Sequence, residues 1–217
     1  MAMRSVKSIA FVFACCLLGG CETTNTTGQN PAQAVSSDYI HQPTKFSFPK
    51  NLGGFHRSRV EKFDPAGKDI GIGYNNPLPI AATIFVYPGP KDVALTPAPK
   101  QEGARQSLLT SHFEQCKGDI FRAHPDAKLI SEADYTLTQR SESFKGKKAV
   151  FSLKYTFGLS SQDSTSELYV FLMEPGVKFL VTDRYFVSYR VTYPVSKQEQ
   201  ASREIAELMW NLAWPIK

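Results

Sequence analysis

Apolar and polar side chains alternate along much of the chain, and this pattern constrains the fold more than any other feature. In residues 149–157 and 185–193 every second residue is apolar. A period of two is typical of β-strands that bury one face. Residues 168–173 are apolar at every position, which indicates a central strand covered on both sides. We expect an antiparallel sheet of about six to seven strands, drawn from residues 57–63, 70–74, 80–87, 129–137, 149–157, 168–173 and 185–193.

Two segments have a helical period instead. The first has an apolar stripe formed by Leu109, Phe113, Cys116 and Ile120. The second, residues 196–213, has a stripe formed by Ala201, Ile205, Leu208 and Leu212. Ser196 and Glu199 have the spacing of a capping box, so we expect the second helix to begin there. Because helices interrupt the strands only twice, the pattern predicts an α+β fold with two main helices packed on the sheet.

The N-terminus carries a targeting pattern. Arg4 and Lys7 precede an uncharged apolar run at residues 9–20, which is shorter than the roughly 20 residues of a transmembrane helix. The run ends in Leu-Gly-Gly before Cys21, and this ending resembles the lipobox of bacterial lipoproteins. The resemblance implies that residues 1–20 are a cleaved signal peptide and that Cys21 is lipidated. A plain secretory signal is the alternative.

The rest of the N-terminal region is consistent with an envelope protein that has one domain. Residues 22–38 are rich in Thr, Asn, Gln and Ser, so we expect residues 21–44 to be a lipidated cysteine and a disordered tether. Residues 45–217 would then form a single globular α+β domain. Glu22 follows the cysteine, and by resemblance to the enterobacterial sorting pattern this favours the outer membrane, facing the periplasm.

Charge and cysteine content exclude two further features. Without Arg4 and Lys7 the 25 basic residues fall to 23 against 20 acidic ones, a balance that does not indicate nucleic-acid binding. Only Cys116 would remain as a free thiol after processing and lipidation. We therefore expect no intramolecular disulfide, even in an oxidising compartment.

Four segments before the final helix carry a second resemblance: FSFPKNLGGFHR, FDPAGKDIGIGY, AATIFVYP and YRVTYP, at residues 46–57, 63–74, 81–88 and 189–194. Together they resemble PsbP-like domains, which include an extrinsic photosystem protein and several bacterial lipoproteins of unknown role. The resemblance implies a curved antiparallel sheet in an α/β/α sandwich and a non-enzymatic binding or accessory role. It transfers no functional residue, because the matching positions look structural.

A search for catalytic chemistry yields little. Cys116 and His112 are four residues apart on a predicted helix, as a Cys–His pair would be, but Cys116 lies on the apolar stripe, which favours a core residue. The four histidines show no metal-ligand spacing. The glycines of 71–73 are followed by Asn76-Pro77 rather than by a helix, and the S-x-x-K match at 47–50 lacks a K-T-G partner. We expect no catalytic, cofactor or metal site.

Two features indicate a partner surface. Trp210 lies opposite the apolar stripe of the closing helix and should point away from the sheet, unless residues 46–48 or a loop cover it. Lys145, Lys147 and Lys148 are predicted to form a hairpin tip, which is either a solvated turn or a contact for anionic head groups or a protein. We expect a membrane-anchored, non-enzymatic binding module with an envelope protein as partner. A small-ligand carrier or a hydrolytic enzyme is the alternative.

Overall fold

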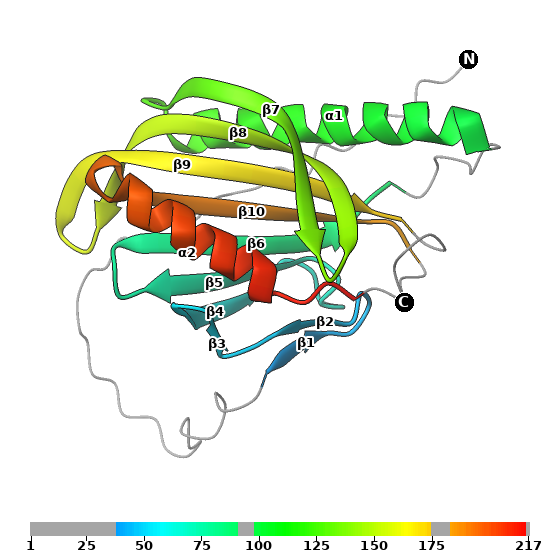
Figure 1. The fold of residues 1–217 in the computed structure, drawn as a ribbon, viewed down its shortest axis with the longest axis horizontal. Coiled ribbons are helices and arrows are strands. Elements are labelled where there is room, and N and C mark those ends of the chain that lie inside the picture. Colours follow the sequence, from blue (N-terminus) through cyan, green and yellow to red (C-terminus); the bar gives the residue numbers. More distant parts are fainter. Residues whose placement is uncertain (1–37, 91–97, 175–182, 216–217) are drawn as a thin grey trace. The chain divides into compact units, whose positions relative to one another are not determined.

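A computed structural model of the chain describes residues 38–90, 98–174 and 183–215. Its main feature is an antiparallel sheet of eight strands in the order β3-β4-β5-β6-β10-β9-β8-β7. Figure 1 shows the sheet with α2 in front of it. The strands are β3 Asn51–Leu52, β4 Phe55–Lys62, β5 Ile70–Asn76, β6 Ile80–Pro88, β7 Lys128–Gln139, β8 Glu142–Phe157, β9 Ser160–Met173 and β10 Tyr185–Pro194.

Alternation along β10 separates two cores on opposite faces of the sheet. Tyr185, Val187 and the other odd positions pack with helix α2, Gln198–Asn211. Phe186 packs with helix α1, Ala98–Ala123. The central strand β9 contributes to both cores, because its residues from Leu168 to Met173 are all buried. The predicted α+β class, the two helices and the central position of residues 168–173 are therefore confirmed.

A short hairpin completes the core on the α2 side. Strands β1, Tyr39–His41, and β2, Phe46–Phe48, pair with each other. The Phe46 ring lies 5.6 Å from the ring of Trp214, in an edge-to-face contact, and both residues are buried. Trp214 also donates a hydrogen bond to the Tyr189 hydroxyl across 2.9 Å. The segment that follows α2 is therefore held by the hairpin and by strand β10.

Three details of the predicted fold are wrong. The main sheet has eight strands rather than six or seven, because the two-residue strand β3 leaves no periodic signal. The domain includes β1 and buried Thr44, so the boundary at residue 45 lies too late. The helix α2 begins at Gln198 after a short 3-10 turn at Val195–Lys197, and no side chain caps it, so Ser196 and Glu199 do not form a capping box.

Candidate functional site

The outer face of α2 presents the most exposed indole of the described domain. The apolar stripe of α2 is buried as predicted, with Leu208 fully covered. Trp210 falls about half a turn away from Leu208 and Leu212, and 60% of it is exposed. The aromatic hairpin at 46–48 packs on Trp214 instead of covering Trp210. The predicted orientation of Trp210 is confirmed.

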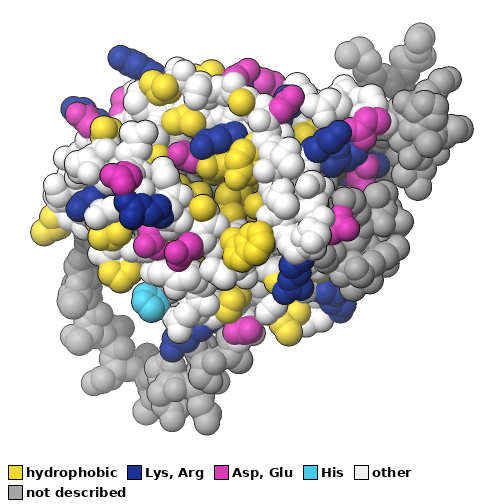
Figure 2. Space-filling view, viewed as in Figure 1, with side chains coloured by type: hydrophobic (Ala, Val, Ile, Leu, Met, Phe, Trp, Pro, Cys, Tyr) yellow, Lys and Arg dark blue, Asp and Glu magenta, His cyan; other side chains and the backbone are white. Residues whose placement is uncertain are grey.

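Charged side chains line the same face of the helix. Glu199, Arg203 and Glu207 follow one another at intervals of four residues, and Trp210 comes three residues later. All three charged residues are exposed, and Arg203 forms an ion pair with Glu199. We call these three residues and Trp210 the α2 surface. Figure 2 shows hydrophobic side chains in the middle of this side of the molecule, with charged ones around them.

The composition of the α2 surface is typical of a protein contact. Aromatic residues and arginine are enriched at such interfaces relative to the rest of the protein surface. Tryptophan is among the residue types most enriched at the energetic centre of an interface, because a large rigid ring buries much area in one contact. The α2 surface is therefore the candidate binding site of the described domain.

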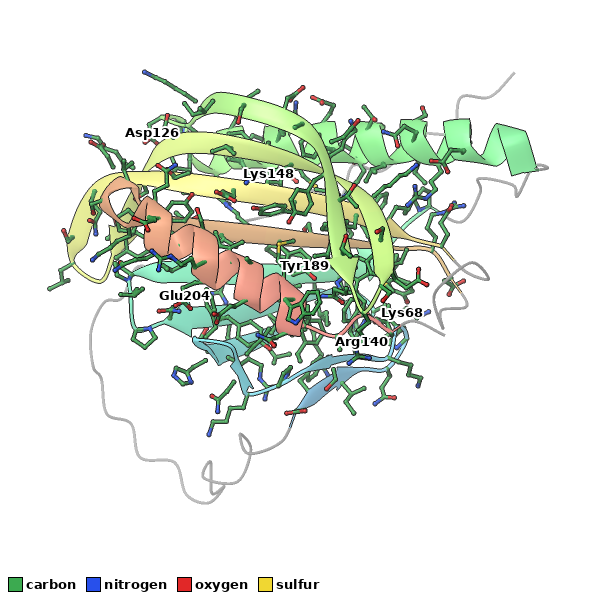
Figure 3. The ribbon with its side chains drawn as sticks, viewed as in Figure 1. Lys68, Asp126, Arg140, Lys148, Tyr189 and Glu204 are labelled. Carbon is green, nitrogen blue, oxygen red and sulfur yellow. The ribbon has the colours of Figure 1, made fainter. Side chains whose placement is uncertain are left out.

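The prediction that Lys145, Lys147 and Lys148 form a hairpin tip is wrong. The tip of the β7–β8 hairpin is formed by Arg140 and Ser141, both with positive φ, whereas Lys145, Lys147 and Lys148 lie inside β8. Lys147 pairs with Asp134 at 2.9 Å, on the face that carries α1. Lys148 points to the opposite face, beside α2 (Figure 3). The three lysines therefore do not share one surface.

Lys148 belongs instead to a polar network around Glu167 of β9. Its Nζ lies 2.9 Å from Glu167 Oε2, and Tyr169 donates a hydrogen bond to the same oxygen. The hydroxyl of Tyr193 donates to Glu167 Oε1 across 2.7 Å. Burial alone would raise the pKa of Glu167, but these three donors outweigh it, and the pKa lies below its usual value. Glu167 is therefore a buried, ionised carboxylate.

This network was not predicted from the sequence. Glu167 directly precedes the apolar run 168–173, and a single acidic residue at the start of such a strand was the available signal. Lys148 is partly exposed, and its ammonium also lies 4.9 Å above the centre of the Tyr169 ring. The Tyr135 ring packs edge-on against Tyr169 at 4.9 Å. The arrangement therefore orients one lysine over an aromatic surface.

The Cys116–His112 pair exists, but it is not set up for nucleophilic chemistry. Sγ of Cys116 lies 3.3 Å from Nε2 of His112, and the Tyr87 hydroxyl lies 2.6 Å from the same nitrogen. Burial raises the pKa of the Cys116 thiol to about 11 and lowers the pKa of His112 to about 4. Both groups are thus neutral near pH 7, without the thiolate that such catalysis needs. Cys116 is half-buried against the α1 core rather than fully buried.

The other sequence candidates have structural surroundings. The glycines at 71 and 73 lie within β5, and Ser47 lies within β2 rather than at a helix start. In the described ranges, no three His, Cys, Asp or Glu side chains come close enough together to hold a metal ion. Asp64 and Asp69 occupy the turn between β4 and β5, where the Asp69 amide donates to Asp64 Oδ2. Cys21 lies outside the described residues.

Comparison with known proteins adds no family. The chain matches no protein-family model and no curated protein. Within the part of the chain that the structure describes, neither helix combines the length and the apolar character needed to span a bilayer.

Proposed function

We propose that this protein is an envelope lipoprotein that is anchored through Cys21 and acts as a non-enzymatic binding or accessory module. The lipobox-like ending before Cys21 supports the anchor, and Glu22 after it supports the outer membrane with the domain facing the periplasm. The exposed Trp210 is the observation that carries the binding role. A large exposed aromatic ring can bury much area in a single contact, and such rings are enriched at protein interfaces.

The finer fold assignment is part of the same proposal. We assign the domain to the PsbP-like α/β/α sandwiches, because α1 and α2 cover opposite faces of one antiparallel sheet. The resemblance in residues 46–57 and 63–74 falls on β2 to β5, which are structural elements. The accessory role that this resemblance implies is consistent with Cys116, the one free thiol of the described residues, being kept protonated.

The binding role can be tested with the full chain in its own membranes. Membranes that contain the wild-type protein, Trp210→Ala or Leu159→Ala are cross-linked, and the captured proteins are quantified by mass spectrometry. Leu159 is a fully exposed apolar residue outside α2 and serves as the matched control. We expect one envelope protein to be captured by wild type and Leu159→Ala and to be lost with Trp210→Ala. Equal capture by all three would contradict the proposal.

The anchor is tested separately. Cys21→Ser should block lipidation and release the protein from the membrane fraction, because a lipidated cysteine is the proposed attachment. Intact-mass measurement of the wild-type protein should show a chain that begins at Cys21 and carries added acyl groups. An unchanged mass together with unchanged membrane fractionation would exclude the lipoprotein assignment.

A second candidate function is that of a small-ligand carrier. Lys148 favours it, because its partly exposed ammonium has hydrogen atoms left after the bond to Glu167 and lies over the Tyr169 ring, against which Tyr135 packs. Such a group could bind a carboxylate with an apolar body. The test is a titration with dodecanoate and with dodecyltrimethylammonium, followed by tryptophan fluorescence. A carrier of this kind should bind the first but not the second, and Lys148→Met should abolish the difference.

A further inference from the structure

The two edges of the sheet differ in the length of their outermost strand. At the β3 end, the edge strand is two residues long and is followed by a turn whose Gly54 lies against Glu204 of α2. At the other end, β7 is twelve residues long, and among the described residues it pairs with β8 alone. Figure 1 shows β7 along this border of the sheet. A long edge strand carries a row of backbone N–H and C=O groups that are not used by the sheet itself.

Nothing in the described domain covers the first part of this edge. Residues 128–134 are exposed at every position, whereas Leu137 and Gln139 are buried near the end of α2. The exposed stretch includes two apolar side chains, Leu129 with 41% and Ile130 with 63% of their surface open. Edge strands are usually short or covered where pairing with another chain must be avoided. The register shift between Leu129 and Ser131 disfavours pairing with another chain at that point of β7. From Ser131 onward the pairing of β7 with β8 is regular.

The two faces of β7 beside this edge differ in chemistry. Glu132 and Asp134 share the face that carries α1, where they pair with Lys117 and Lys147. Their side chains nevertheless remain 49% and 78% exposed. Ala133 and Tyr135 lie on the opposite face. An added strand would therefore meet acidic groups on one of its faces and a small and an aromatic side chain on the other.

We propose that the open edge of β7, residues 128–136, binds an extended segment of a partner protein as a ninth strand of the sheet. Backbone hydrogen bonds would supply the affinity and alternate side chains the specificity, as in other β-strand additions. The segment that fits has basic residues at alternate positions, beside Glu132 and Asp134, and apolar residues between them. Opposite charges on facing strands stabilise such a pair. This surface is separate from the α2 surface, so it extends the proposed binding role without depending on Trp210.

A second copy of the chain fits this edge less well. Two β7 strands paired antiparallel and centred on residue 132, 133 or 134 would place Glu132 or Asp134 opposite another acidic side chain. Like charges directly opposite each other destabilise a strand pair. In these registers the charge pattern favours a basic segment of a different protein over a second copy.

The probe is the peptide acetyl-Lys-Val-Lys-Val-Lys-Val-amide, titrated into the full chain in a neutral detergent. Its controls are the peptide with Glu in place of Lys and the peptide with Pro in place of the central Val, which removes a backbone donor. We expect the Lys–Val peptide alone to bind, and to slow hydrogen exchange in β7 but not in β3 and β4. Slowed exchange elsewhere with none in β7, or equal binding of the Glu–Val peptide, would overturn the proposal.

Variants locate the contact. Glu132→Gln with Asp134→Asn should weaken the Lys–Val peptide about two- to thirtyfold, the range expected from two cross-strand charge pairs. Glu199→Gln with Glu207→Gln makes the same charge change on the α2 surface and should leave the affinity unchanged. Trp210→Ala should also leave the affinity for the peptide unchanged. The strand addition at β7 can therefore fail or succeed independently of the binding role proposed for Trp210. An equal loss with both double variants would show general charge attraction and would contradict the strand addition.

Discussion

Lys148 of β8 and Glu167 of β9 form an ion pair with an Nζ to Oε2 distance of 2.9 Å, on the face of the sheet that carries α2. The two residues are diagonal neighbours, since Lys148 faces Tyr169 and Glu167 faces Val150 in the strand register. Tyr193 reaches the same carboxylate from β10. The buried charge of Glu167 thus links the three neighbouring strands β8, β9 and β10. Its removal should therefore lower the free energy of unfolding of the whole domain.

We predict that Glu167→Gln lowers the free energy of unfolding by about 1–3 kcal/mol at pH 7, because donors are left without a charged acceptor. The folded-state pKa of Glu167 lies below its unfolded value. Its stabilisation is therefore complete above about pH 5 and is lost as the pH falls through the folded pKa. Urea unfolding of wild type and variant at pH 7 and at about pH 3 measures this difference, which should shrink in acid.

Tyr193→Phe is the control for this prediction. It removes one donor from Glu167 Oε1 and keeps the ring in the core, so it should cost less than Glu167→Gln. A difference between wild type and Glu167→Gln that stays constant between pH 7 and pH 3 would show that Glu167 is not ionised in the folded state.

Periodicity predicted the strands and helices of this fold, but not which side chains pair across neighbouring strands. The apolar residues of 149–157 and of the stripe from Leu109 to Ile120 contribute to a buried face. Burial requires apolar side chains at regular intervals, so both elements are visible as periodic patterns in the sequence. The pairing of Lys148 with Glu167 depends on register between β8 and β9, and no local pattern encodes that register. The hairpin tip shows the same limit. Positive φ at Arg140 and Ser141 places the turn where no glycine marks it.

We predict that truncating Leu208 lowers the stability of the fold much more than truncating Trp210, although both residues lie on α2. Leu208→Ala should cost about 2–5 kcal/mol of stability, because it empties a fully buried core position. Trp210→Ala should change stability by only about 0.5 kcal/mol, since most of the side chain is in water. Thermal or urea unfolding of both variants checks this. If losing Trp210 destabilises the fold as much as losing Leu208, the indole is a core residue and the α2 surface is not a binding site.

We predict that Cys116 is a slow thiol in the folded protein. Burial raises its pKa to about 11, so very little thiolate exists at pH 8. A bulky disulfide reagent should therefore label it far more slowly in buffer than in urea, with Cys116→Ala as the background for any other thiol. Cys116→Ala itself should cost about 1 kcal/mol through lost packing. Rapid labelling without urea would show that the thiol is accessible and ionised.

Asp69 gives the prediction with the opposite sign to Glu167. Burial, and then the charge of Asp64, raise the pKa of Asp69 to about 6. The folded state therefore binds an extra proton between about pH 4 and pH 6, and stability is lost as the pH rises through this window. Asp69→Asn cannot ionise, so it should be equal to wild type near pH 4 and more stable at pH 7.5. The gain there should be about 1–2 kcal/mol, less than the full pKa shift would give, because solvent screens a half-buried carboxyl.

Asp64→Asn is the matched control for Asp69→Asn, since it removes the other carboxylate of the same turn. Burial alone would raise the pKa of Asp64, but backbone amides of the turn, including that of Asp69, outweigh it and hold the pKa below its usual value. The charge of Asp64 is therefore favourable in the folded state, and its neutralisation should destabilise the fold at pH 7.5. Urea unfolding of the two variants between pH 4 and pH 7.5 separates the two carboxylates. Destabilisation by both variants at pH 7.5 would show that Asp69, like Asp64, is held as a favourable charge.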